Sequence, residues 1–136
     1  MKRAYLISPY SGDTKKNVAY ALRCMHHALS EGYSPYASHI LFAASGCLND
    51  DDPKDRDFGF RAGYAFLSTC EIALSFMDLG VSRGMRADLD ASRRLDIPIR
   101  YLSLTGAIPH VDYIHTLSLP HEHMPCAMCQ VEKERT

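Results

Sequence analysis

Apolar runs of four to six residues alternate with segments of helical spacing along most of this 136-residue chain. Residues 4–7, 72–77 and 97–102 form the clearest runs, each bounded by turn-forming residues, and a weaker strand pattern covers residues 34–37. Short apolar runs of this kind are typical of strands that are buried on both faces of a parallel sheet. The alternation therefore predicts an α/β fold, in which a parallel sheet of about five strands carries helices on both faces.

Three segments between these runs are expected to be helical. The first begins near Asp13 or Thr14, either of which can cap it, and its apolar residues recur at helical spacing. These residues are Val18, Leu22, Met25 and Leu29. A second helix is expected from about Arg56, after a polar and acidic stretch over residues 46–57 that predicts an exposed loop. The third is expected over residues 83–95.

We expect residues 1–105 to form one α/β domain and residues 106–136 to form a C-terminal extension that packs on it or trails from it. Within the extension, residues 111–119 can form a short strand. Four metal-ligating residues follow: His121, His123, Cys126 and Cys129. Two imidazoles and two thiolates can hold zinc, but this spacing matches no zinc-finger pattern. A tail that is disordered or contacts a partner is the other interpretation, and no metal is assigned.

The charge and cysteine content argue against several classes of protein. Lys and Arg (15) nearly balance Asp and Glu (16), so no overall field attracts the chain to nucleic acid polymers or to membrane surfaces. No apolar run approaches the ~20 residues that a membrane-spanning helix needs. Five scattered cysteines fit a reducing compartment better than a disulfide framework, so we expect a cytoplasmic protein.

Two loops combine small and hydroxyl-bearing residues at points where a strand ends and a helix begins. The first contains Ser8, Ser11 and Gly12, and the second contains Ser82 and Gly84. Free backbone N–H groups and the positive end of the helix dipole favour anions at such points. Together the loops indicate a phosphorylated ligand, bound outside the carboxyl ends of the strands. An ordinary strand–helix turn is the alternative for the first loop.

Asp88 falls on the side of the third expected helix that faces the core. Helical geometry places it on the stripe formed by Met85, Leu89, Ser92 and Leu95. A carboxylate on the buried side loses hydration unless it is paired or functional. Asp88 is therefore a candidate functional residue, and a salt bridge to one of the arginines nearby is the alternative.

Three further residues are expected at or near the same rim of the sheet. His39 closes the second expected strand and Asp78 follows the third, so both are candidates for ligand contact. Tyr5 lies inside the first strand, from which its hydroxyl can reach a ligand. The structural alternatives are a hydrogen-bonding role for His39, a loop cap for Asp78 and a core position for Tyr5.

The order of these motifs resembles that of the nucleoside 2-deoxyribosyltransferase-like superfamily. The matching positions are residues 5–12, 17, 32–35, 39 and 70–71, and the pattern S-x-G-M-x-x-D over residues 82–88. The chain looks closest to the small, uncharacterised bacterial and phage members, and is more distantly similar to the 2′-deoxynucleoside 5′-monophosphate N-glycosidases. The resemblance covers roughly residues 3–104. It implies a flavodoxin- or Rossmann-like sheet, usually in a homodimer, and no metal or organic cofactor.

The resemblance also implies roles for ligand-binding residues of this chain. Ser82 and Gly84 match the positions that hold a 5′-phosphate in the hydrolase branch. Ser8, Tyr10 and Gly12 match a first loop that approaches the base and the sugar. The nucleotide-binding domain is then residues 1–105.

Asp88 matches the carboxylate that attacks or stabilises C1′ of the sugar as the base leaves. The family residue at this position is usually glutamate, so the carboxylate here is one methylene shorter. An acid that the family often carries near Gly63 is missing, and Asp57 is the nearest candidate.

The expected function is hydrolysis or transfer at the N-glycosidic bond of a nucleoside 5′-monophosphate or a related nucleotide. The alternative is a non-catalytic binding protein that sequesters a nucleotide or a nucleotide-derived signal. The expected partners are this small molecule and a second copy of the chain, with no membrane and no nucleic acid polymer.

Overall fold

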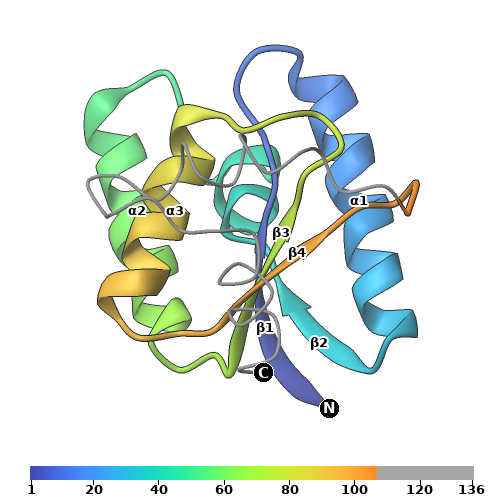
Figure 1. Cartoon of the computed structure of the whole chain (residues 1–136). Coiled ribbons are helices and arrows are strands. Elements are labelled where there is room, and N and C mark those ends of the chain that lie inside the picture. The colour runs from blue at the N-terminus through green and yellow to red at the C-terminus, as the bar shows by residue number, and fades with distance from the viewer. Residues whose placement is uncertain (107–136) are drawn as a thin grey trace.

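The computed structural model describes residues 1–106, in which strands and helices alternate as the sequence predicts (Figure 1). The strands are β1 (Lys2–Ile7), β2 (Tyr33–Tyr36), β3 (Ile72–Phe76) and β4 (Ile99–Leu102). The helices are α1 (Thr14–Ser30), the π-helix η1 (His39–Ala44), α2 (Pro53–Leu67) and α3 (Arg83–Arg94). The predicted α/β class is therefore confirmed.

The described strands form one parallel sheet in the order β2-β1-β3-β4. β1 lies inside it, because Ala4 is level with Pro35 of β2 on one side and with Ile72 of β3 on the other. After β1 the chain adds β2 on one side, and it then returns to add β3 and β4 on the other side. This reversal leaves a crevice at the carboxyl ends of β1 and β3. We predicted about five strands, but residues 1–106 form four. The additional strand suggested for residues 111–119 lies outside the described residues.

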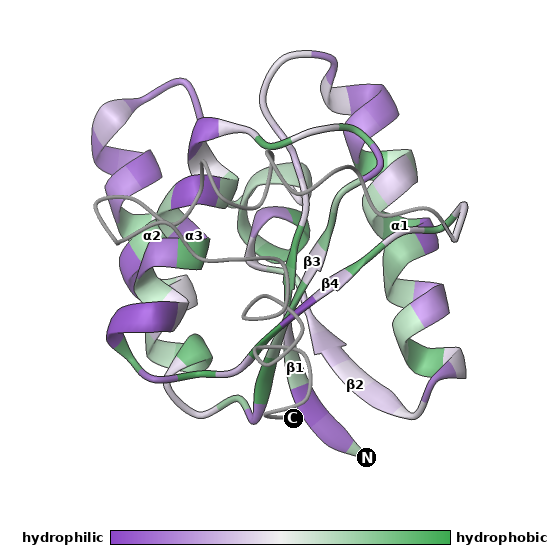
Figure 2. Cartoon of the chain, viewed as in Figure 1, coloured by the Kyte–Doolittle hydropathy of each residue, from purple (hydrophilic) through white to green (hydrophobic). Residues whose placement is uncertain are grey.

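Helices cover both faces of the sheet, as predicted (Figure 1). Alternate strand residues point to opposite faces, so Leu6 and Leu74 pack with α1, whereas Ile7 and Ala73 pack with α2 and α3. Figure 2 shows the hydrophobic residues concentrated on β1 and β3, while the edge strand β2 is more hydrophilic. These two cores, one on each face, hold the sheet in place and so position the loops that follow its strands.

The buried face of α1 differs from the predicted stripe. Leu22 and Leu29 are about half exposed, at 51% and 48%. The buried residues are Asn17, Tyr20, Ala21, Cys24 and Ala28. Met25 of the predicted stripe is partly buried against the same core. The small side chains of Ala21, Cys24 and Ala28 let the helix approach the sheet closely, and Leu22 and Leu29 lie on its more exposed side. Because both sets recur at helical spacing, spacing alone did not identify the inward face.

The segment between β2 and α2 contains more regular structure than predicted. His39 begins η1, three residues after the end of β2, and does not close the strand as expected. α2 begins at Pro53 rather than near Arg56. Asp52 caps this helix, since its carboxylate accepts a hydrogen bond from the Lys54 N–H group at 2.9 Å. Arg56 therefore lies at the beginning of α2, close to the rim of the sheet.

Two kinds of feature are missing from residues 1–106. None of their helices is long and apolar enough to cross a membrane. Within the same residues, no three His, Cys, Asp or Glu side chains cluster in a way that would hold a metal ion. The possible zinc ligands His121, His123, Cys126 and Cys129 lie outside the described residues. The domain boundary and the homodimer stay predictions.

Candidate functional site

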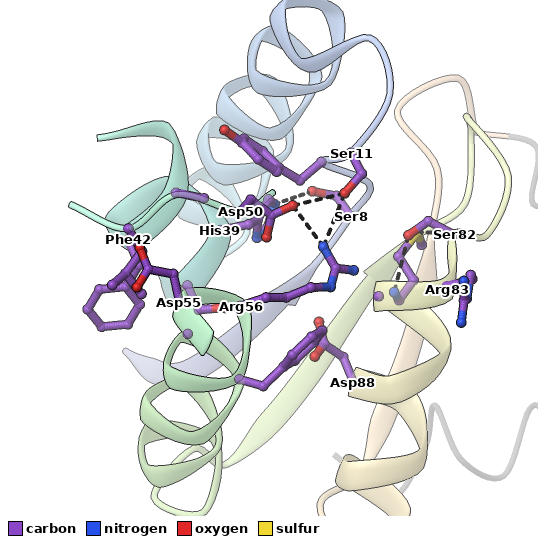
Figure 3. A pocket seen from close by; sticks show the side chains of 18 residues that line it. Ser8, Ser11, His39, Phe42, Asp50, Asp55, Arg56, Ser82, Arg83 and Asp88 are labelled. Atoms are coloured by element: carbon purple, nitrogen blue, oxygen red, sulfur yellow. Dashed lines mark hydrogen bonds and ion pairs between the residues drawn. The ribbon is translucent and has the colours of Figure 1, made fainter. Parts of the chain in front are cut away.

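A cavity of about 370 Å³ opens at the carboxyl end of β1, between η1, α2 and α3 (Figure 3). Its walls also include the loop after β1 and the acidic loop before α2. The volume is typical of sites that bind small organic molecules. The residues predicted to contact a ligand that line this cavity are Ser8, Tyr10, His39, Ser82, Gly84 and Asp88.

Asp88 lies on the α3 side of the cavity and is only 9% exposed. Its Oδ1 atom has no hydrogen-bond partner among the described residues. Burial raises the pKa of Asp88 to about 7. A hydrogen bond from Tyr64 and the positive charge of Arg56 both lower this pKa, but their effect is smaller than that of burial. The structural alternative, a salt bridge from Asp88 to a nearby arginine, is not formed within residues 1–106, where Arg56 pairs with Asp50. Near neutral pH, the carboxyl group is therefore divided between its neutral and ionised forms.

Tyr64 of α2, which does not itself line the cavity, hydrogen-bonds to Asp88. Burial raises the pKa of Tyr64, and the nearby charge of Asp88 raises it further, so the phenol stays protonated. A phenol can donate to an ionised carboxylate and can orient it. This polar contact of Tyr64 was not predicted from the sequence.

Arg56 reaches from α2 toward the loop after β1 (Figure 3). Its Nη1 atom donates to Asp50 Oδ2 at 2.8 Å and to Ser11 Oγ at 3.4 Å. Ser11 Oγ also donates to Asp50 Oδ2, at 3.0 Å. The Arg56 guanidinium carbon lies 5.3 Å from the centroid of the Phe60 ring. These contacts hold a positive charge over the cavity and near Asp88.

Ser8 and His39 link the end of β1 to the beginning of η1. Ser8 Oγ lies 2.8 Å from His39 Nε2, within hydrogen-bond distance. The Tyr10 ring meets the imidazole edge-on, with centroids 6.4 Å apart. Burial lowers the pKa of His39 to about 4, so the ring is neutral at pH 7. This wall therefore offers hydrogen bonds to a ligand without adding charge.

Ser82 and Gly84 form the N-terminal end of α3. Ser82 is the N-cap, and its Oγ atom accepts a hydrogen bond from the Met85 N–H group at 3.2 Å. The Ser82 hydroxyl keeps its own hydrogen for a ligand. A Cβ atom built on Gly84 would come no closer than 3.8 Å to another residue, at Arg56 Nη2. The backbone is thus open to the cavity, as an anion site at a helix N-terminus requires.

The other three predicted ligand contacts, Tyr5, Gly12 and Asp78, are not part of the cavity lining. Tyr5 is 1% exposed, and its hydroxyl is 2.9 Å from Ser38 Oγ, which does line the cavity. Gly12 adopts φ +99° in the turn before α1, a conformation that glycine favours. The structure thus gives Tyr5 a supporting position and Gly12 a role in the turn.

Asp78 accepts several hydrogen bonds at the opposite side of the rim. Its donors include the Tyr20 hydroxyl at 2.5 Å, the Ser103 hydroxyl and the Leu104 N–H group at 3.0 Å. Burial alone would raise the pKa of Asp78, but the hydrogen bonds from Ser103, Tyr20 and the backbone lower this pKa to about 2. Asp78 therefore ties α1 and the segment after β4 to the end of β3.

The lining residues from η1, the acidic loop and α2 were not predicted from the sequence as ligand contacts. These residues include Phe42, Asp50, Asp55, Arg56 and Phe60. Composition indicates a solvated acidic loop, and only the fold brings it to the cavity. One signal was available, because helical side chains point back toward the N-terminus. An arginine at the start of a helix can therefore reach an acidic run just before it.

The fold and its cavity define a flavodoxin-like α/β protein with a candidate ligand site at the carboxyl ends of parallel strands. A similar solved structure is that of a 2-deoxyribosyltransferase from the psychrotolerant bacterium Bacillus psychrosaccharolyticus. The two share 21% sequence identity with a TM-score of 0.55, over 83% of this chain and 82% of that chain. At this level of identity the similarity establishes the fold.

Residues 2–102 match the family described as "Domain of unknown function (DUF7768)", and the chain belongs to this family. The matched segment includes every strand of the sheet and every residue that lines the cavity. No curated protein matches the chain.

Proposed function

We propose that the protein cleaves the N-glycosidic bond of a nucleoside 5′-monophosphate or a related nucleotide, passing the sugar to water or to another base. The observation that carries the proposal is the Asp88 carboxyl group, which is buried against the cavity with its Oδ1 atom unpartnered among the described residues. Leaving a buried polar atom unpaired costs about 1–3 kcal/mol, and a ligand can remove that cost. The sequence resemblance and the fold of the deoxyribosyltransferase support the same class of ligand.

The reaction joins one oxygen of ionised Asp88 to C1′, or places it close enough to stabilise an oxocarbenium-like sugar. The bond from C1′ to the base nitrogen breaks, and the base keeps the electron pair and takes a proton from water. Attack of water on C1′ then releases the sugar with a new hydroxyl group, regenerates the Asp88 carboxylate and frees a proton. In transfer, the nitrogen of a second base takes the place of water.

The surrounding residues position the two ends of the substrate. Tyr64 orients the Asp88 carboxylate by its hydrogen bond. Ser82 and the backbone at Gly84 hold the 5′-phosphate at the N-terminus of α3. Binding the phosphate away from the reacting bond orients C1′ against the carboxylate. As part of this proposal, which rests on the resemblance, the protein acts as a cytoplasmic homodimer without a metal or organic cofactor.

A binding protein that sequesters a nucleotide is the second candidate function. The observation that favours it is the pKa of Asp88, which burial raises to about 7. Much of the population is then protonated at neutral pH, and a protonated carboxyl group donates a hydrogen bond instead of attacking C1′. The shorter aspartate side chain, in a position where the family usually has glutamate, also suits holding the ligand without cleavage.

Incubation of the protein with a panel of nucleoside 5′-monophosphates tests both functions. Free base detected by chromatography supports the enzyme. A ligand that raises the melting temperature but is recovered intact after denaturation supports the binding protein. The absence of both base release and a melting shift would contradict both functions.

A further inference from the structure

Arg56 contributes a positive charge beside the proposed phosphate site, in a position that the sequence resemblance does not assign. We infer that Arg56 makes this site selective for phosphorylated over unphosphorylated nucleosides, by binding the phosphate group together with the N-terminus of α3. The inference rests on the proposed function and adds the residue that recognises the charge of the ligand.

The guanidinium of Arg56 lies next to the place where the N-terminus of α3 would hold a phosphate. Its Nη2 atom lies 3.8 Å from the position of a Cβ built on Gly84. Ser82, Gly84 and Arg56 all line the same cavity, and Figure 3 shows Arg56 extending across it toward the start of α3. An anion bound at this helix N-terminus is therefore within reach of the guanidinium.

The guanidinium also has donors left for a ligand. Within residues 1–106, its hydrogen bonds to Asp50 and Ser11 both start from Nη1. Arginine carries five N–H donors in a rigid planar fork, which matches two oxygens of a phosphate. Asp50 and Ser11 thus fix one edge of the fork, while Nη2 faces Gly84. A side chain fixed in advance loses less conformational entropy when the ligand binds.

The charges of the cavity explain why a cation is needed there. The carboxylates of Asp50, Asp55 and Asp88 line the cavity and would repel an anion. A monoester phosphate carries about −1.5 to −2 charges at pH 7. Arg83 also lines the cavity, but it is exposed, and in Figure 3 its side chain points away from Arg56 and Asp88. Arg56 can therefore offset, from within the cavity, the repulsion between these carboxylates and a bound phosphate.

Lys16 offers a matched comparison on the other side of the same loops. It lines a neighbouring cavity that shares Ser11 and Ser82 with the first. Like substitution of Arg56, substitution of Lys16 removes one positive charge near the N-terminus of α3. It leaves the contacts of Arg56 untouched.

Calorimetric titration of the full chain with common 2′-deoxynucleosides and with their 5′-monophosphates tests the inference. The measured quantity is the ratio of the two affinities for each base. We expect Arg56→Gln to lower this ratio by about 10- to 100-fold, the size of a lost charge-assisted hydrogen bond, and to change nucleoside affinity by less than about threefold. Arg56→Lys restores only part of the ratio, because lysine lacks the planar fork. Lys16→Gln leaves the ratio unchanged.

The outcomes separate this inference from the function on which it rests. An Arg56→Gln protein that binds nucleosides normally and keeps the wild-type ratio would overturn the role of Arg56 alone. A ratio that falls with Lys16→Gln and not with Arg56→Gln would place the phosphate in the neighbouring cavity, which also overturns it. A wild-type protein that binds neither ligand and releases no base would contradict the proposed function. Retained nucleoside binding shows that the Arg56→Gln protein is folded.

Discussion

The backbone of Gly63 packs so closely against the Tyr5 hydroxyl that a Cβ atom at position 63 would lie 2.8 Å from Tyr5 Oη. The same Cβ would meet Ser38 Cβ at 3.1 Å and Ser38 Oγ at 3.2 Å. The hydrogen bond between Tyr5 and Ser38 therefore fills the space that a side chain at position 63 would need. This packing gives a physical reason why the acid that the resemblance expects near position 63 is missing here.

Gly63→Ala should lower the free energy of unfolding by about 1–3 kcal/mol, because either Tyr5 or Ser38 must move. The matched control is Gly59→Ala on the same helix, where the new Cβ would meet only Leu48 Cδ1 at 3.5 Å, an ordinary contact. This control should be neutral or stabilising by about 0.5–1 kcal/mol, since alanine favours helix. Urea denaturation measures both, and equal effects of the two substitutions would contradict the packing at Gly63.

Asp88→Asn should stabilise the protein in a pH-dependent way. Burial raises the pKa of Asp88 from 3.8 to about 7, so between these values the folded state binds more protons than the unfolded state. The contribution of Asp88 to stability therefore falls as pH rises through this window, and it stays low above about pH 7. Asparagine remains neutral, so its advantage should be on the order of 1–4 kcal/mol at pH 8 and near zero at pH 4.

Urea denaturation at these two pH values measures the effect of Asp88→Asn. The matched control is Asp90→Asn on the same helix, because Asp90 is more exposed and lies 3.9 Å from Arg93. Its effect should stay within about 0.5 kcal/mol at both pH values. An Asp88→Asn protein that is no more stable at pH 8 than the wild type would show that the ionised Asp88 carboxylate does not lower the free energy of unfolding.

The fold could be predicted from the sequence because strands buried on both faces must be continuously apolar. Residues 4–7 of β1 and residues 72–76 of β3 are buried and, apart from Ser75, apolar. The helical segments between the strands supply the crossovers that a parallel sheet requires. The inward stripe of α1 could not be predicted from spacing. The choice between Leu22 and Cys24 depends on how closely the helix packs on the sheet, which is a tertiary property.

The candidate site was predictable to the extent that it depends on strand ends and helix faces. The buried position of Asp88 follows from helical periodicity and is confirmed. Arg56 and Asp50 were missed because a charged loop and the start of a helix are usually solvated. Only the path of the chain through η1 and α2 brings these two residues over the cavity.

His39 should make the protein less stable in mild acid. Burial lowers the pKa of His39 from 6.5 to about 4, so within this window the unfolded state binds more protons than the folded state. The contribution of His39 is complete above about pH 6.5 and is lost as pH falls toward 4, a loss on the order of 2 kcal/mol. This trend opposes that of Asp88, so the clean comparison is between Asp88→Asn and the double variant with His39→Gln.

Denaturation of these two proteins between pH 4 and pH 6.5 measures the contribution of His39. The stability of Asp88→Asn should rise with pH across the window, and His39→Gln should remove most of that rise. An unchanged slope in the double variant would mean that the His39 imidazole is accessible to protons in the folded state.

The central claim is that the Asp88 carboxylate acts on C1′ of a bound nucleotide. The most direct measurement is the rate of free base release at pH 8 by the wild type and by Asp88→Asn, on the same nucleoside 5′-monophosphate. The variant keeps the shape of the side chain and is expected to be at least as stable, so lost activity cannot come from unfolding. We expect base release to fall by about 100-fold or more while the nucleotide still raises the melting temperature of the variant. Undiminished base release by Asp88→Asn would contradict the claim.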